Sequence, residues 1–311
     1  MYSRQYENEI DDVAMRAMLV DAWRIAGCEA GYWHIGAALA WRTFLMSFRV
    51  DLRANIRLWF ADANALVGFA VFGDDFSLDW QLHPAHSWRG IEEEMLAWGE
   101  ARWREAMADS TIPTERKRAL IAGALATDVR RCEFLTQHGF TREEHPYLRF
   151  ARTLDDPIAV PTLPQGFSVR GVAGENEITN RASAHREAFH PSRVTDEGYA
   201  RLMRMRDYDR ELDVVAVAPE GTLAAYAMTW LDVTNQVGEF EPVGTRPSFQ
   251  RRGLARAVLL QGMRRLRERG ANTVLVCTGS ANENAIRLYE SVGFRVVNQD
   301  HNFVRQSKVT K

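Results

Sequence analysis

The chain has 311 residues, 46% of them hydrophobic and 26% charged, which is the composition of a folded globular protein with a substantial core. Its 39 lysines and arginines nearly balance its 41 aspartates and glutamates, so charge argues against nucleic acid or a membrane surface as partner. The three cysteines, Cys28, Cys132 and Cys277, are far apart, which speaks against a disulfide framework and a zinc site.

The first residues, MYSRQYENEIDDVAM, are charged and lack the apolar core of a signal peptide. No apolar run approaches the roughly 20 residues that a membrane span requires. We therefore expect a cytoplasmic protein, monomeric or homodimeric.

The two ends of the chain predict a similar order of elements. In the N-terminal half, a strand-turn-strand is predicted at IRLWFADANALVGFAVFG, residues 56–73. It precedes a strand that ends at a proline, and a glycine six residues after that proline begins a helix. The C-terminal half repeats this order from LDVVAVAPEGTLAAYAMTWLD, residues 212–232. The paired positions are Pro84 and Pro247, Gly90 and Gly253, and the helix ends Gly139-Phe140 and Gly293-Phe294.

Between them, residues 151–166 contain three prolines and little periodicity, which is typical of a linker. We therefore predict a tandem repeat, with one domain at 1–150 and a second at 167–311. The predicted class is α/β.

The segment QRRGLA, residues 250–255, precedes a predicted helix over 251–269. The apolar face of that helix consists of Leu254, Val258, Leu259, Gly262 and Leu266. Unpaired N–H groups and the helix dipole make such a start a site for anions, and a glycine without a Cβ lets a phosphate approach the backbone.

Upstream, in VGEFEPVGTRP, residues 237–247, Glu239 and Glu241 alternate with Phe240 and so share one side of a strand. Pro242 cannot donate to a ladder, which predicts that the strand splays from its neighbour. The backbone groups of residues 243–245 are then free to pair with an extended ligand.

Downstream, in ANENAIRLYESVGF, residues 281–294, Asn282 and Tyr289 are seven apart and share a helix face. Taken singly, Asn282 fits an N-cap and Tyr289 a core aromatic equally well.

Together these three segments resemble the GNAT superfamily of acyl-CoA-dependent N-acyltransferases, over roughly residues 165–305. The resemblance implies two GNAT-like domains, each a mixed, mostly antiparallel sheet with a central splayed strand pair flanked by helices. It implies acetyl-CoA as co-substrate, a small-molecule primary amine as acceptor, and direct transfer in a ternary complex.

By the same resemblance, the cofactor is held by Val243, Gly244, Thr245, Gln250, Arg251, Arg252, Gly253, Leu254, Ala255 and Asn282. Glu241 or Glu239 takes the proton of the amine, directly or through water, and Tyr289 protonates the departing CoA thiolate. No metal is implied.

The N-terminal copy lacks these groups. When Pro84 is aligned with Pro247, Ser87 corresponds to Gln250, Glu92 to Ala255, and Phe76 and Leu78 to the two glutamates. When the Gly-Phe ends are aligned, Asp128 corresponds to Asn282 and Leu135 to Tyr289. Carboxylates in the first helical turn would repel a pyrophosphate, so we expect a non-catalytic domain. The alternative is a second active site with Asp79 as its base.

Several readings stay open. A different class is a weak or inactive CoA-binding regulatory protein. Among enzymes, the tandem order also resembles mycothiol synthases, which acetylate the cysteinyl amine of a sugar conjugate, and aminoglycoside acetylation is a further possibility.

The family's acceptor region falls at residues 184–213, where Phe189, His190, Tyr199 and Tyr208 mix with acids. His185 and His190 do not share a helix face, which speaks against a metal pair, and Cys277 is predicted to pack inside a buried strand.

Overall fold

The computed structural model describes residues 1–27, 30–61, 65–109 and 119–307, so Cys28 and residues 62–64 of the first predicted turn lie outside the described part. Contacts divide the chain into two compact units. Unit 1 comprises Met1–Trp33, Met46–Leu148 and Asn298–Lys311, and unit 2 comprises His34–Leu45 and Arg149–Val297. Each unit thus takes in a segment from the other end of the chain.

The sheet of unit 1 has the strand order β1-β2-β3-β4-β5-β13. Its strands are β1 (Tyr2–Gln5), β2 (Ile56–Phe60), β3 (Leu66–Phe72), β4 (Ser77–Leu82), β5 (Ala119–Leu125) and β13 (Arg295–Gln306), with the short β6 (Thr141–Arg142) beside β13. The β4–β5 pair is parallel, at Ser77↔Ile121 and Leu78↔Ala122. β13 runs antiparallel to β5 from Asp300↔Leu125 to Gln306↔Ala119, so the last strand of the chain completes this sheet.

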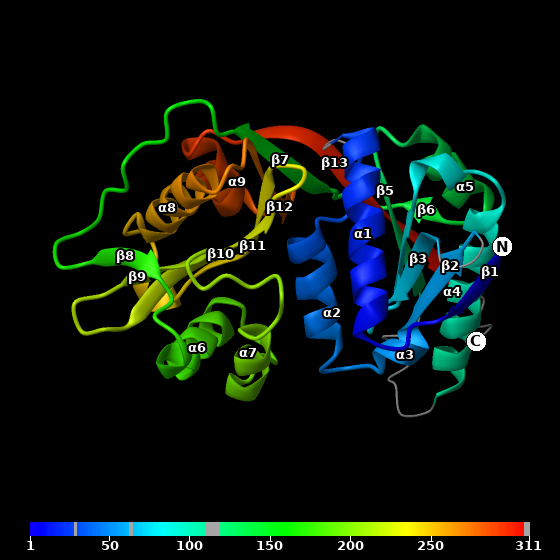
Figure 1. The fold of residues 1–311 in the computed structure, drawn as a ribbon, viewed down its shortest axis with the longest axis horizontal. Coiled ribbons are helices and arrows are strands. Elements are labelled where there is room, and N and C mark those ends of the chain that lie inside the picture. The colour runs from blue at the N-terminus through cyan, green and yellow to red at the C-terminus, as the bar shows by residue number, and fades with distance from the viewer. Residues whose placement is uncertain (28–29, 62–64, 110–118, 308–311) are drawn as a thin grey trace. The chain divides into compact units, whose positions relative to one another are not determined.

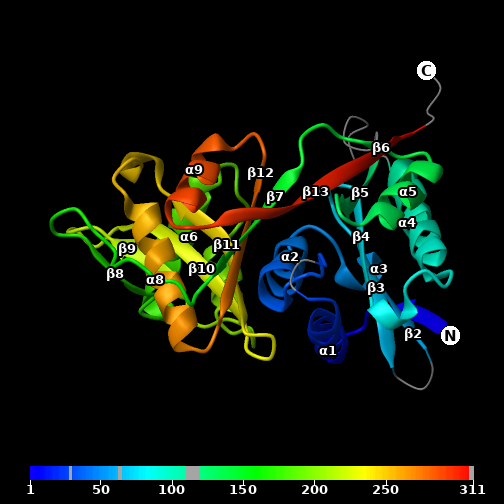
Figure 2. The same cartoon turned by 90° about the horizontal axis from the view of Figure 1, so that it is seen from above.

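Helices cover both faces of the unit 1 sheet (Figure 2). They are α1 (Glu9–Ala26), α3 (Leu52–Asn55), α4 (Ile91–Ala108) and α5 (Val129–Gln137), with a 3₁₀ turn at Pro84–His86. α1 begins where the Asn8 side chain accepts a hydrogen bond from the Ile10 N–H, and it ends before Gly27. The core includes Trp59, Leu78, Met95 and Leu135, and Phe303 of β13 packs among them.

The sheet of unit 2 has the order β7-β12-β11-β10-β9-β8. Its strands are β7 (Tyr147–Thr153), β8 (Ser168–Gly171), β9 (Asp213–Val217), β10 (Leu223–Asp232), β11 (Val237–Thr245) and β12 (Thr273–Gly279). β10 is antiparallel to both β9 and β11, whereas β11 and β12 are parallel. As in unit 1, a parallel pair stands beside antiparallel strands.

The helices of unit 2 lie on both faces of its sheet, α8 on one and α6 on the other (Figures 1 and 2). They are α6 (Ile178–Ala188), α7 (Asp196–Leu202), α8 (Leu254–Glu268) and α9 (Glu283–Ser291), with 3₁₀ turns at Glu175–Glu177 and Pro247–Phe249. A π-helix (Ile35–Ala40) and α2 (Trp41–Met46) bring early residues of the chain into this unit.

The predicted mixed α/β architecture is confirmed, and so is the apolar face of α8, whose buried residues include Leu254, Val258, Leu259, Gly262 and Leu266. The helix begins at Leu254 rather than Arg251, because Arg251 and Gly253 adopt positive φ angles of 61° and 77° that a helix does not permit. The first three residues of the predicted linker, 151–153, belong to β7, and Leu154 and Ile158 beyond them are buried.

Candidate active site

The central strands of unit 2 separate at the point that Pro242 predicts. β11 and β12 pair from Val237↔Thr273 to Phe240↔Val276, and the pairing stops there although both strands continue. On its other edge β11 stays paired with β10, with a register shift between Ala227 and Thr229, where Glu241 and Pro242 form a bulge. The splay is therefore confirmed, and Glu241 is its first residue.

The backbone of β11 beyond the bulge offers polar groups to the open side. The Arg246 N–H donates to the Ala224 carbonyl of β10, at 2.9 Å. Because successive residues of a strand direct their backbone groups to opposite edges, Val243 and Thr245 face away from β10. Gly244 faces β10, and a Cβ on it would lie 2.6 Å from the Tyr226 hydroxyl oxygen.

Glu239 and Glu241 lie opposite Phe240, which packs against Gly262 of α8. Both carboxylate side chains are half-buried, and Oε2 of Glu239 is buried without a hydrogen-bond partner among the described residues. Loss of solvation, and then the negative charge of Glu239, raises the pKa of Glu241 to about 8. Glu241 thus titrates near neutral pH, where a general base works best.

Tyr289 comes from α9 and is buried, with its ring 5.7 Å from that of Phe150 and 6.0 Å from that of Phe294. Burial raises the pKa of its hydroxyl, and the charges of Glu241 and Cys277 raise it further. The hydroxyl therefore stays protonated across the physiological range, as an acid must. Glu241, Cys277 and Tyr289 share one electrostatic environment at the splay.

Cys277 differs from its prediction because the ladder between β11 and β12 ends one residue before it. The thiol was expected inside a buried strand, but the residue is half-buried at the start of the splay. The expected full burial of Cys277 is therefore not observed.

The predicted phosphate loop lies between the 3₁₀ turn Pro247–Phe249 and α8. Gly253 is the N-cap, with no side-chain cap and no acidic residue in the first turn, so the first N–H groups of α8 have no side-chain acceptor. A Cβ at Gly253 would meet nothing within 4 Å. The positive φ, rather than close packing, therefore requires glycine.

The remaining loop residues are exposed, including Gln250 and Arg251. Arg252 is held by its own loop, because it donates to the Ser248 carbonyl at 3.2 Å and its guanidinium lies 5.2 Å from the Phe249 ring centre. The open helix start and the arginines fit a pyrophosphate.

Asn282 is an N-cap in the structure, since its Oδ1 accepts a hydrogen bond from the Ala285 N–H at 3.2 Å. Its capping role is thus the local structural one that the sequence allowed. The arrangement places α9 so that Tyr289 reaches the splay.

Two tyrosines of the predicted acceptor region belong to a buried network instead. Tyr199 and Tyr208 both donate to the Asp213 carboxylate, which also pairs with Arg181 at 2.9 Å. The Arg181 and Asp213 side chains are 1% and 0% exposed, so these tyrosines stabilise the interior. Phe189 remains 43% exposed on the same stretch.

Comparisons with known proteins agree with this geometry. The Acetyltransferase (GNAT) family pattern matches residues 180–294. A mycothiol acetyltransferase of Kineococcus radiotolerans is 34% identical over 71% of this chain and 70% of its own length. Another, from Thermobispora bispora, is 29% identical over 75% of this chain and 78% of its length.

The chain belongs to the GNAT family of acetyltransferases.

Solved structures show the same tandem GNAT fold over the whole chain. A GCN5-related N-acetyltransferase of Sphaerobacter thermophilus is 20% identical, covers 98% of this chain and 95% of its own, and has a TM-score of 0.66. A tandem GNAT protein from the clavulanic acid biosynthesis pathway is 17% identical, covers 100% and 99%, and has a TM-score of 0.67. The protein is thus a tandem GNAT-type N-acetyltransferase, as its sequence motifs predict.

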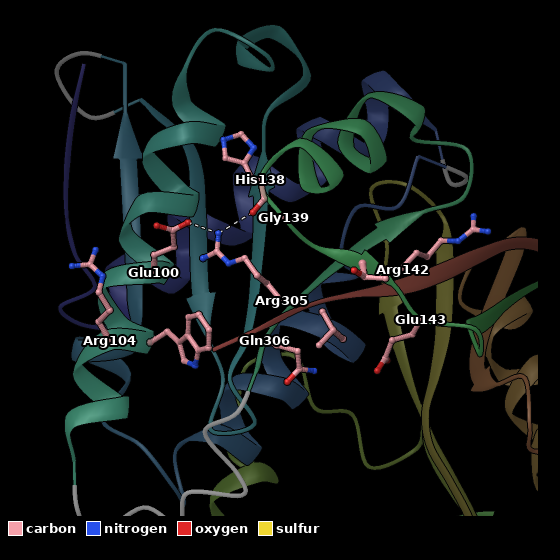
Figure 3. A pocket seen from close by; sticks show the side chains of 11 residues that line it. Glu100, Arg104, His138, Gly139, Arg142, Glu143, Arg305 and Gln306 are labelled. Carbon is pink, nitrogen blue, oxygen red and sulfur yellow. Dashed lines mark hydrogen bonds and ion pairs between the residues drawn. The ribbon is translucent and has the colours of Figure 1, made fainter. Parts of the chain in front are cut away.

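A hollow in unit 1 of this GNAT protein has a volume of about 920 Å³ (Figure 3). Charged side chains line it, and Arg305 bridges the Glu100 carboxylate at 2.7 Å and the His138 carbonyl at 3.0 Å. No predicted site residue is among its lining residues. In the described part of the chain, no group of three His, Cys, Asp or Glu residues could hold a metal, and no helix is long and apolar enough to cross a membrane.

The sequence motifs do not reveal the residues that pack behind β11. Trp230, Tyr226 and His34 contact β11 or its neighbours, as described below. In the sequence, Trp230 and Tyr226 resemble ordinary residues of an alternating strand. His34 is about two hundred residues before β11, so no local sequence pattern predicts that these three residues lie near β11.

Proposed function

We propose that this enzyme transfers acetyl from acetyl-CoA to the primary amine of a small molecule, with the working site in unit 2. The observation that carries the proposal is Glu241, a carboxylate titrating near pH 8 at the splay of β11 and β12, in the same environment as Tyr289. The splay and the uncapped start of α8 fit an extended ligand that ends in a pyrophosphate.

In the proposed mechanism, acetyl-CoA supplies an activated thioester. The backbone of Val243 and Thr245 aligns the pantetheine arm, and Gln250–Ala255 binds the pyrophosphate. Asn282, the cap of α9, contacts the cofactor beyond the loop. The N–H of Val243 polarises the thioester carbonyl.

Glu241 then accepts a proton from the ammonium group of the acceptor, because only the free amine has a lone pair with which to attack. With a pKa near 8, about a tenth of the Glu241 carboxyls are ionised at pH 7, and the fraction rises as pH rises. The amine nitrogen bonds to the acetyl carbon, the C–S bond breaks, and Tyr289 donates its proton to the leaving thiolate. The second proton lost by the nitrogen restores the Tyr289 hydroxyl. Glu239 tunes Glu241 through its charge.

We assign catalysis to unit 2 alone, because unit 1 fills the corresponding groove with its own groups. The loop before α4 repeats the backbone of the loop before α8, with positive φ angles of 61° at Trp88 and 93° at Gly90. Here the Glu92 carboxylate accepts a hydrogen bond from the Trp88 N–H at 2.5 Å. Glu92 is 3% exposed and takes the place expected for a phosphate oxygen.

The edge of β4 is also occupied. By position, Trp80 and Leu82 correspond to Val243 and Thr245. The Arg131 side chain donates to the Trp80 carbonyl at 3.3 Å, and the Tyr32 hydroxyl donates to the Leu82 carbonyl at 2.9 Å.

The cavity that remains among these groups of unit 1 measures only about 80 Å³. Leu135, at the position of Tyr289, is fully buried. These contacts support a non-catalytic unit 1 and a catalytic unit 2, whose bounds differ from the expected 1–150 and 167–311 because residues 34–45 and 298–311 are exchanged between them.

The choice of acceptor follows from similarity to named relatives. Because relatives of this chain are named mycothiol acetyltransferases, the cysteinyl amine of a sugar conjugate is the first acceptor to test. Thiol release from acetyl-CoA should be measured with this amine, with aminoglycosides and with simple primary amines. Release with at least one of them is expected. Tight acetyl-CoA binding with no release across the panel would instead indicate a CoA-binding regulator.

Replacing Tyr289 with phenylalanine should lower kcat by about 100-fold, since proton transfer by a positioned side chain contributes that order of acceleration. The acetyl-CoA dissociation constant should change little, because the ring keeps its contacts with Phe150 and Phe294. Steady-state kinetics and calorimetric binding on the same preparation check both. Because the pKa of Tyr289 is raised, wild-type activity should not fall from ionisation of this hydroxyl below about pH 10. An unchanged kcat in Tyr289→Phe would remove Tyr289 from the mechanism.

A further inference from the structure

Residues His34–Leu45, which we call the early segment, are close to the N-terminus in sequence but belong to unit 2. The imidazole of His34 fastens this segment to the catalytic strand. Its Nδ1 accepts hydrogen bonds from the N–H groups of Gly36 and Ala37 at 3.1 and 3.3 Å, which caps the π-helix. Its Nε2 lies 3.2 Å from the Val237 carbonyl oxygen at the start of β11. Since a carbonyl only accepts, Nε2 carries the proton.

The π-helix lies directly on Trp230 of β10. A Cβ on Gly36 would fall 2.5 Å from Cβ and 2.6 Å from Cε3 of Trp230, a separation that real atoms do not reach. Gly36 is therefore required by close approach, and Trp230 is 1% exposed beneath it. The indole cannot rotate out of its position while the π-helix is in place.

Trp230 in turn holds the bulge that presents Glu241. Its Nε1–H donates to the main-chain carbonyl of Glu241 at 2.6 Å. The β10–β11 ladder is interrupted here, because the register shifts and Pro242 has no N–H to donate. The indole thus supplies a hydrogen bond at the point where the ladder supplies none, and it fixes the direction in which residue 241 leaves the strand.

The early segment also reaches the far side of the bulge. Trp41 meets His185 edge-on, with ring centres 5.6 Å apart, and Nδ1 of His185 lies 2.9 Å from the Tyr226 hydroxyl oxygen. Tyr226 pairs across the ladder with Gly244, whose missing Cβ leaves room for that hydroxyl. The segment therefore supports β10 on both sides of the irregular stretch opposite Glu241 and Pro242.

We propose that the early segment is a positioning element for catalysis, which fixes the Glu241 bulge through Gly36 and Trp230. The inference rests on the proposed role of Glu241 as base. It gives the N-terminal part of the chain a function in the reaction that requires no contact with the substrate. Trp230 is then a positioning residue.

The test is Trp230→Phe, which keeps an aromatic ring and removes the donor. We expect kcat to fall about tenfold, the contribution of one hydrogen bond, with the KM for acetyl-CoA within twofold of wild type. The midpoint of the kcat/KM profile should move below pH 8, because a relaxed bulge lets water reach Glu241. Gly36→Ala, which lifts the π-helix from the indole, should shift kcat and the midpoint in the same direction.

Trp59→Phe is the matched control, because Trp59 is also 1% exposed and donates its indole N–H to Glu94 at 2.9 Å, but in unit 1. It should lower the thermal midpoint without moving the pH midpoint. If Trp230→Phe and Gly36→Ala both keep the wild-type kcat and pH midpoint while Glu241→Gln is inactive, the positioning role is wrong and the base stands. Full activity in Glu241→Gln would show instead that Glu241 is not the general base.

Discussion

Replacing Ala255 with glutamate should abolish acetyl-CoA binding, because it rebuilds in unit 2 the carboxylate that occupies the loop of unit 1. In unit 1 the equivalent Glu92 accepts the N–H of Trp88, at the position of Arg251. A carboxylate about 4 Å from a pyrophosphate oxygen at an effective dielectric of about 20 costs about 4 kcal/mol. We therefore expect the dissociation constant to rise by about 1,000-fold.

Titration calorimetry checks this result and the number of sites together. The wild-type chain should bind one acetyl-CoA, and Ala255→Glu should bind none at the same concentrations. Ala255→Gln has nearly the same size without the charge, so it should retain much more of the affinity. Binding of two acetyl-CoA molecules by the wild type, or of one by Ala255→Glu with unchanged affinity, would contradict the assignment of the cofactor to unit 2 alone.

Replacing Glu241 with glutamine should lower kcat by 10²–10⁴-fold, the usual contribution of a general base. Acetyl-CoA affinity should be kept, since the amide preserves the shape of the side chain. In the wild type, the base acts when deprotonated, so kcat/KM should rise with pH through a midpoint near 8 and level off above it. A pH-rate profile from pH 6 to 10 with the identified amine measures this midpoint.

Glu239→Gln separates the two carboxylates. Its negative charge is one of the two causes of the raised pKa of Glu241, so its removal should move the midpoint to lower pH while leaving most of the activity. If Glu239→Gln is the inactive variant and Glu241→Gln keeps its turnover, the assignment of the base is reversed.

The sequence locates those parts of this site that local rules control. Pro242 predicts an irregular stretch of β11 because a residue without an N–H cannot complete a ladder, and Gly253 predicts the start of α8 because glycine tolerates the positive φ found there. The face shared by Glu239 and Glu241 follows from strand alternation alone. Each of these signals lies within a few residues of the feature that it predicts.

The features that the sequence misses depend on contacts between distant segments. Nothing near Trp230 predicts that a glycine at position 36 will lie against it, and nothing near Phe303 predicts a place in the core of unit 1. The helix start is misplaced by three residues because Arg251, like Trp88, adopts a left-handed conformation that is uncommon for its residue type. Cys277 is misjudged because the end of a ladder depends on its partner strand.

The exchange of segments between the units bears on what each unit needs in order to fold. A chain cut within 151–166 would deprive β5 of its partner β13 and leave an unpaired strand edge, which favours aggregation. The other fragment would lose the early segment and expose Trp230 to water. Because each unit contains a segment from the other end of the chain, the N-terminal part cannot be deleted without removing residues of unit 2.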